Sequence, residues 1–289
     1  MAQLKEIKSR MQSVRSTQKI TSAMMMVSSA RLQKVQRTIE NLSRYEQKLN
    51  QILQLFLQQE EKIETPFTEV RTVKRVAIVA FASNTGLAGR YNNNIIDRVK
   101  EVVESYKSLG EENILLYPLG EKLAKAARKM TLSLHEEYND LAEKPTYKST
   151  KHLAEELMEM FSRGKIDRVE LIYHHFKSKG SQELFHLPFL PIELKATVSD
   201  KPATDYIVEP DRSTIITLLI PKVLKMKLFT AHLDSVTSEH AARMTAMQMA
   251  TDNAEELSDE LKLEYNKLRQ QSITNELLDI VGGSFGQHS

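Results

Sequence analysis

The sequence predicts an α/β protein in which long N- and C-terminal helices form an antiparallel coiled coil beside a Rossmann-like α/β domain. Both ends carry a sustained apolar repeat, and strand patterns alternate with helix patterns between them. Most of the nine glycines and all eight prolines lie between Pro66 and Pro221. We therefore place the coiled-coil shaft at residues 1–60 and 210–283, and the α/β domain at 72–209.

Composition excludes several classes of protein. The 289 residues include 40 Lys and Arg against 38 Asp and Glu, so overall charge does not favour nucleic acid as a partner. Cysteine is absent, which rules out disulfides and thiolate metal sites. The sequence shows neither an apolar run of about 18 residues, which a membrane-spanning helix needs, nor a secretory signal. These features are typical of a soluble cytosolic protein.

The N-terminal helix is predicted from an apolar seam between Leu4 and Phe56. Alternating steps of three and four residues give sixteen positions, of which twelve are apolar. A period near 3.5 residues keeps one stripe facing a partner helix, as in a coiled coil. The seam positions are Leu4, Ile7, Met11, Val14, Gln18, Thr21, Met25, Ser28, Leu32, Val35, Ile39, Leu42, Glu46, Leu49, Leu53 and Phe56. At 1.5 Å per residue, this helix would be about 80 Å long.

The C-terminal helix is predicted from Asp211 to Val281. Pro221 should kink its first turns, and Gly282-Gly283 should end it. Its seam is less regular than that of the N-terminal helix and tolerates polar residues such as His240. The seam positions are Ile215, Leu219, Lys222, Met226, Phe229, Leu233, Val236, His240, Arg243, Met247, Ala250, Ala254, Leu257, Leu261, Glu264 and Leu268.

Length and charge indicate that the two helices pair with each other. A compact domain of the intervening residues would be only about 40 Å across, so both helices should project from it. Because the chain enters the domain through one helix and leaves it through the other, the two helices should run antiparallel. Residues 1–37 contain eight basic side chains and one acidic one, whereas residues 252–264 contain six acidic side chains and one basic one. Ile20, Met24 and Val27 form a second apolar stripe beside the seam, which favours contact with an outside partner.

The central region reads as a doubly wound sheet. Strands are predicted at 75–81, 114–119, 168–176 and 184–190, with a further edge strand at 205–209. Helices are predicted from about 92 to 109, at 121–130 and at 151–162. Strands that alternate with helices in this way indicate a mainly parallel sheet.

The sequence offers no candidate for catalysis. The loop SNTGLAGRYN (residues 83–92) matches neither GxGxxG nor a P-loop, so its glycines are expected to serve backbone geometry. His174 and His175 are adjacent in a predicted strand, point to opposite faces and cannot share a metal ion. We therefore assign no catalytic, cofactor-binding or metal-binding residue.

Three segments resemble the gamma subunit of bacterial F-type ATP synthases. They are LKEIKSRMQSVRSTQKITSAMMMVSSARLQKVQ (4–36), SEHAARMTAMQMATDNA (238–254) and YNKLRQQSITNELLDIVGG (265–283). The central TGLAGRYN is similar to that family's GLCGxxN element, with Ala88 and Tyr91 in place of its usual residues. The resemblance implies a rotor subunit that couples ion flow through a membrane ring to ATP synthesis and hydrolysis in catalytic α/β subunits.

The resemblance also implies partner-binding residues. Arg269 and Gln270, within the family's YN-x-x-RQ, would hydrogen-bond a loop of the beta subunit. Lys19, Met24 and Met25, within QKIT-x-AM, would lie opposite the moving levers of the beta subunits. Tyr206 would lie near the epsilon subunit and the membrane c ring.

The implied partners are therefore the alpha, beta and epsilon subunits and the c ring, with no nucleic acid, small-molecule substrate or cofactor. The implied location is the cytoplasmic face of the bacterial inner membrane, reached through the partners. Two alternatives remain open from the residues alone. One is a Rossmann-type nucleotide-binding enzyme with helical appendages, and the other is a coiled-coil adaptor for nucleic acid.

Overall fold

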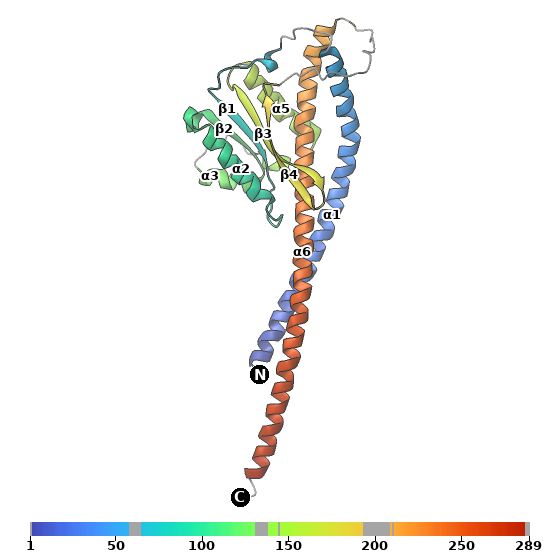
Figure 1. Ribbon diagram of the computed structural model, residues 1–289, viewed down its shortest axis with the longest axis vertical. Helices are drawn as coiled ribbons and strands as arrows, with labels where there is room; N and C mark the ends of the chain where they lie inside the picture. The colour runs from blue at the N-terminus through green and yellow to red at the C-terminus, as the bar shows by residue number, and fades with distance from the viewer. Residues whose placement is uncertain are drawn as a thin grey trace. The chain divides into compact units, whose positions relative to one another are not determined.

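The computed structural model describes residues 2–57, 65–130, 138–143, 145–192, 209 and 211–286. Contacts divide the chain into two compact units. The terminal unit contains Met1–Ser28 and Met244–Ser289, and the sheet unit contains Ser29–Arg243. Two helices, α1 (Ala2–Leu57) and α6 (Arg212–Gly286), contribute residues to both units (Figure 1).

In the terminal unit, α1 and α6 pair in antiparallel orientation. The hydroxyl groups of Thr21 and Thr251 are hydrogen-bonded at 2.8 Å. Tyr265, further along α6, shares a groove with Lys8 and Met11, which lie earlier on α1. Because partner numbers rise on one helix as they fall on the other, the predicted antiparallel coiled coil is confirmed.

The predicted seam of α1 is confirmed, since all sixteen positions are buried or half-buried. The predicted seam of α6 is wrong at two positions in the terminal unit, Leu257 and Glu264. Ser258 is 5 % exposed, whereas the predicted Leu257 is 44 % exposed. Likewise Tyr265 is half-buried and Glu264 is exposed. Small polar side chains occupy this seam because the two backbones approach closely enough for Thr21 and Thr251 to bond.

The C-terminal end of α6 also differs from the prediction. Gly282-Gly283 does not end the helix, which continues to Gly286. A glycine within a helix lowers stability by only about 1 kcal/mol relative to alanine, so a helix of 75 residues can include two of them. The helix also passes through Pro221. The kink predicted there stays a prediction.

The sheet unit contains a four-stranded sheet in the order β2-β1-β3-β4. Its strands are β1 (Val76–Phe81), β2 (Ile114–Leu119), β3 (Arg168–Ser178) and β4 (Ser181–Leu190). The central strand β1 pairs in parallel with β2 and β3, and β4 runs antiparallel to β3. The four central strands are therefore confirmed, while residues 205–208 of the predicted edge strand lie outside the described residues.

Helices cover both faces of the sheet and make it a three-layer α/β structure (Figure 1). One core joins β1 to α2 (Tyr91–Ser105) and α3 (Glu121–Lys129). The other joins the opposite face of β1 to α5 (Tyr147–Ser162), α6 and the end of α1. Shorter elements are α4 (Asn139–Glu143) and three 3-10 turns at Pro66–Thr68, Lys107–Leu109 and Glu111–Asn113.

Side-chain alternation along β1 explains the two cores. Val76, Ile78 and Ala80 face α2, whereas Ala77 and Val79 belong to the core that contains α5 and α6. A strand buried on both faces needs a continuous apolar run, which is what the sequence of β1 supplies. Within this unit α6 packs as a core helix, and Thr230 on α6 donates a hydrogen bond to Glu46 on α1 at 3.0 Å.

Candidate functional site

The predicted partner-binding residues Lys19, Met24 and Met25 lie on α1 in the terminal unit. Lys19 is exposed, and both methionines are half-buried. Their neighbours Ile20 and Val27 are 60 % and 52 % exposed. The second apolar stripe predicted from the sequence therefore presents two solvent-accessible side chains, with Met24 partly covered.

Lys19 also lines a groove of 470 Å³ between α1 and α6. The groove residues are Lys8, Met11, Gln12, Arg15, Ser16, Lys19 and Tyr265. Arg269 lies one helical turn beyond Tyr265 on α6, and the pairing of Thr21 with Thr251 puts it opposite the start of α1, at a different level from Lys19.

Arg269 and Gln270 are exposed on α6. Among the described residues, neither side chain has a hydrogen-bond or ion-pair partner, so both remain available to a partner protein. Tyr206, the other predicted contact residue, lies outside the described residues.

The oppositely charged blocks meet where the sequence predicts. Arg15 and Lys19 of α1 share a second groove with Glu255 and Asp259 of α6. These side chains flank the seam, where opposite charges favour one alignment of two helices over another. The charge pattern therefore supports the antiparallel pairing and leaves Arg269 outside this groove.

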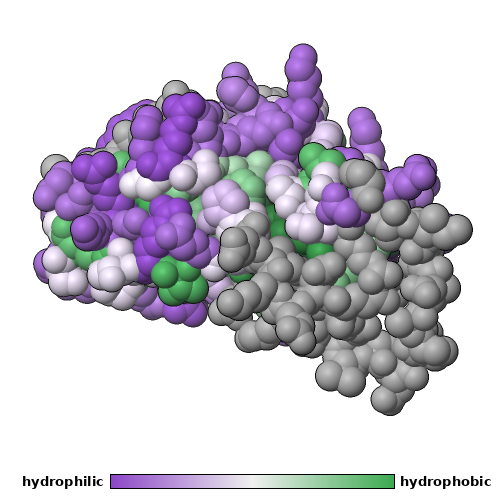
Figure 2. Space-filling view, turned by 90° about the horizontal axis from the view of Figure 1, so that it is seen from above, coloured by the Kyte–Doolittle hydropathy of each residue, from purple (hydrophilic) through white to green (hydrophobic). Residues whose placement is uncertain are grey.

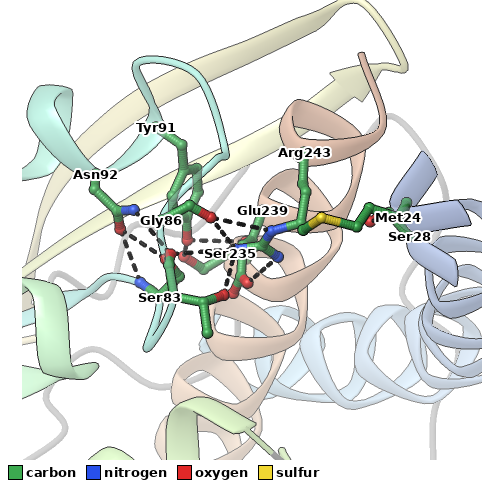
Figure 3. A network of polar contacts seen from close by, with 10 residues as sticks. Met24, Ser28, Ser83, Gly86, Tyr91, Asn92, Ser235, Glu239 and Arg243 are labelled. Atoms are coloured by element: carbon green, nitrogen blue, oxygen red, sulfur yellow. Dashed lines mark hydrogen bonds and ion pairs between the residues drawn. The ribbon is translucent and has the colours of Figure 1, made fainter. Parts of the chain in front are cut away.

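A polar network in the sheet unit was not predicted from the sequence (Figure 3). Its centre is Arg243 on α6, which pairs with Glu239 at 2.5 Å while both side chains are less than a tenth exposed. The Arg243 guanidinium also donates to the Thr85 hydroxyl at 3.0 Å and to the Gly86 carbonyl at 3.4 Å. The spacing of four residues between Glu239 and Arg243 was the signal that could have identified the ion pair.

The loop at Gly86 is held by this network. Asn92 of α2 accepts hydrogen bonds from the backbone N–H and the hydroxyl of Ser83, at 3.0 and 2.9 Å. The loop bends through positive φ at Leu87 (62°) and Gly89 (55°). A phosphate cradle presents backbone N–H groups, whereas this loop presents carbonyl oxygens to an arginine. The prediction that the loop serves backbone geometry is therefore supported.

Tyr91, the first residue of α2, connects this helix to α6 through hydrogen bonds. Its hydroxyl lies 2.7 Å from the Ser235 Oγ, and it donates to the Ser235 carbonyl at 3.0 Å. Its ring stacks on His174 with centroids 4.6 Å apart. Burial, at 4 % exposure, raises the pKa of the Tyr91 hydroxyl far above its ordinary value, so it stays protonated.

Replacing Tyr91 by phenylalanine should lower the free energy of unfolding by about 1–2 kcal/mol, because the buried Ser235 groups lose their partner. Urea denaturation of the full chain measures this change. Tyr45→Phe is the matched control, since Tyr45 is 50 % exposed, and it should change stability by less than about 0.5 kcal/mol. Equal effects of the two substitutions would contradict the assignment.

The adjacent histidines of β3 face apart, as predicted. His174 stacks on Tyr91, whereas the His175 Nδ1 lies 2.6 Å from Asp234 and its ring stacks on Phe185. Within the described part of the chain, no group of three or more His, Asp or Glu residues is arranged to hold a metal ion. None of the helices in that part is both long and apolar enough to cross a bilayer.

Comparisons with known proteins place these features in a family. A model described as ATP synthase matches residues 3–285. The ATP synthase gamma chain of Bacteroides fragilis is 54% identical over 288 residues, which covers 98% of this chain and 99% of that protein. The gamma chain of Flavobacterium johnsoniae is 43% identical over 286 residues, covering 98% of both chains.

Solved structures share the fold. A chain from the OSCP/F1/c-ring structure of the Euglena gracilis mitochondrial ATP synthase superposes with a TM-score of 0.66 at 18% identity, covering 99% of this chain and 95% of that one. A chain from the central stalk and c ring of the Tetrahymena thermophila mitochondrial enzyme gives a TM-score of 0.59 at 22% identity, covering 80% and 99%.

Proposed function

Since this chain belongs to the gamma-chain family of ATP synthases, we propose that its paired terminal helices act as the rotating shaft of the enzyme. The chain is a non-catalytic central-stalk subunit, which couples ion flow through the membrane ring to ATP synthesis or hydrolysis in the catalytic subunits. The observation that carries the proposal is the antiparallel pairing of α1 and α6 in the terminal unit.

A shaft must resist bending and twisting, and it must be asymmetric. The seam of α1 is covered along its whole length, so the paired helices support one another. One side of α1 is apolar, at Ile20 and Val27, whereas the grooves at Arg15 and Lys19 are charged. A rotating surface with unlike sides contacts each of the surrounding catalytic sites differently, which gives the sites different conformations at any moment.

The proposed shaft is residues 1–60 and 210–283, and the proposed domain that joins it to the ring is residues 72–209. The core shared by the sheet, α5, α6 and the end of α1 supports a firm attachment of the helices to this domain. The partners are the alpha and beta subunits around the shaft, with the epsilon subunit and the c ring at the α/β domain. We place Tyr206 at that second contact.

The chain is a peripheral membrane protein through these partners. The cytoplasmic face of the bacterial inner membrane is the proposed side, a proposal that the bacterial gamma chains among its relatives support.

We assign the contact with the beta subunits to Arg269 and Gln270, together with Lys19, Met24 and Met25. Arg269 and Gln270 are exposed and have no partner within the described chain. The arginine can donate a planar, charge-assisted pair of hydrogen bonds to a carboxylate, and the glutamine amide can both donate and accept.

Replacing both Arg269 and Gln270 by alanine should lower ATP synthesis by the assembled enzyme about tenfold, which corresponds to the loss of about 1.4 kcal/mol of interaction. Membrane vesicles energised by an ion gradient provide the measurement. The double variant Lys267→Ala/Gln271→Ala is the control, because both residues are exposed on neighbouring positions of α6.

The control variant should retain nearly full synthesis, and the isolated chain should hydrolyse no ATP. Normal synthesis by the Arg269/Gln270 variant would remove those two residues from the contact without affecting the rotor assignment. The rotor assignment itself fails if a complex that lacks this chain still couples ion flow to ATP synthesis.

A further inference from the structure

A pocket of 730 Å³ lies at the amino edge of the parallel strands. Arg75, Asn113 and Asp167 each come directly before a strand, and the strand register brings these three positions level. The remaining lining residues are Arg71, Thr72, Lys74 and Gly164. Three of the seven lining residues are basic and one is acidic, so we refer to this hollow as the basic pocket.

The acidic residue, Asp167, holds the backbone of Lys74 and Arg75 in place. The Asp167 carboxylate accepts hydrogen bonds from the backbone N–H groups of Lys74 and Arg75, at 2.9 and 3.0 Å. The Arg75 Nε donates to the Asn113 side chain at 3.2 Å, which orients the guanidinium. Among the described residues, the Lys74 ammonium and the two amino groups of the Arg75 guanidinium have no partner.

Arg71 forms a fixed wall of the pocket. Its side chain is 20 % exposed, pairs with Glu69 at 2.7 Å and donates to the Phe161 carbonyl at 3.0 Å. The guanidinium also lies 5.0 Å from the centre of the Phe161 ring. These contacts satisfy Arg71 within the chain, so the positive charge offered to a ligand comes from Lys74 and Arg75.

The side chains that line the basic pocket indicate which class of ligand it can bind. None of the seven lining residues has an apolar side chain, whereas the buried centre of a protein interface is usually apolar. An arginine fork beside a lysine matches the oxygen atoms of a phosphate group. We propose that the basic pocket binds a phosphate group, carried by free phosphate, by a nucleotide or by a phospholipid headgroup.

The pocket contains none of the residues assigned above to partner contacts. It also lies at the opposite edge of the sheet from the usual ligand position, since doubly wound folds generally bind ligands at the carboxyl ends of their strands. The loop at Gly86, which follows the carboxyl end of β1, is already occupied by Arg243.

Binding to the full chain can be measured with three probes at low salt. Calorimetry with inorganic phosphate and with ADP tests the soluble sources, and co-sedimentation with phosphatidylglycerol vesicles tests the lipid source. At least one probe should bind with a dissociation constant of about 1 mM or tighter. The variant Lys74→Gln/Arg75→Gln should weaken that binding about tenfold through the loss of two charge-assisted contacts.

The control variant Lys100→Gln/Lys107→Gln removes two exposed lysines elsewhere in the same unit and should bind as the parent does. All three proteins should show the same thermal unfolding, since the altered side chains are exposed. The proposal is overturned if no probe binds, if both variants lose binding equally, or if a polyglutamate peptide binds more tightly than every phosphate probe. The last result would assign the pocket to an acidic protein segment.

Discussion

Lowering the pH from 6.5 to 4 should cost the isolated chain up to about 8 kcal/mol of stability, because three buried histidines must remain neutral in the folded state. His174, His232 and His240 are 2 %, 1 % and 8 % exposed, and burial lowers the pKa of each from 6.5 to about 4. Between these values the unfolded chain binds protons that the folded chain does not. Stability is therefore full above pH 6.5 and falls as the pH drops, by about 3 kcal/mol per histidine.

Two acidic residues, the buried Glu239 and the half-buried Glu46, oppose this trend. Burial raises the pKa of Glu239 and of Glu46, so the folded state gains protons there before the unfolded state does. Urea denaturation at several pH values measures the net slope. His174→Phe should keep the stack on Tyr91 and make the profile shallower, whereas His152→Gln should leave it unchanged because His152 is exposed. A profile that is flat from pH 6.5 to 4 in the parent chain would contradict the assignment.

Replacing Arg243 by methionine should destabilise the sheet unit by about 3–5 kcal/mol, because the Glu239 carboxylate would remain buried without its partner. The Thr85 and Gly86 carbonyls, which accept hydrogen bonds from the same guanidinium, would also lose their donor. Hydrogen exchange should show greater loss of protection in residues 83–90 than in β3. Urea denaturation gives the total effect.

The double variant Arg243→Met/Glu239→Met separates the ion pair from its surroundings. Replacing both partners of a buried pair by apolar groups of similar size is often neutral, so this variant should recover most of the lost stability. If the double variant is as unstable as the single one, the cost comes from the loop at Gly86 and not from the unpaired carboxylate. A loss of less than 1 kcal/mol in the single variant would show that the pair contributes little.

Much of the fold could be predicted because burial leaves a periodic pattern in the sequence. The α1 helix has one covered stripe, and its sixteen seam positions follow directly from the spacing. Strands β1 and β2 are covered on both faces, so they read as continuous apolar runs, of which β1 is the clearer. Both signals are local, and neither depends on knowing what packs against the segment.

The seam of α6 could not be predicted fully from periodicity. A seam read from Met247 can advance by three and then four residues, or by four and then three. Both readings include every seventh residue, such as Met247, Ala254 and Leu261, which are all buried. They differ at the positions between. Hydrophobicity favours Leu257 over Ser258, yet close backbone approach leaves room for the serine and turns the leucine outward. The choice depends on the partner helix.

The candidate site was predictable only in part. Arg269 and Gln270 are exposed, as contact residues should be, but nothing in their surroundings within the chain identifies a partner. The basic pocket joins residues far apart in sequence, from Arg71 to Asp167, and exists only because three strands begin at one level. The Arg243 network likewise depends on a loop that lies more than 150 residues earlier in the chain.

The antiparallel pairing in the terminal unit has a consequence for the last turns of α6. Thr21 lies opposite Thr251 and Lys8 lies near Tyr265, so the start of α1 is reached opposite residues close to 270. Beyond this point Ile273, Leu277 and Leu278 are 45 to 64 % exposed. Most of the stability of a helix in a protein comes from packing against a partner, so these turns should fray in the free subunit. Their helical order would then depend on the surrounding protein and would develop during assembly.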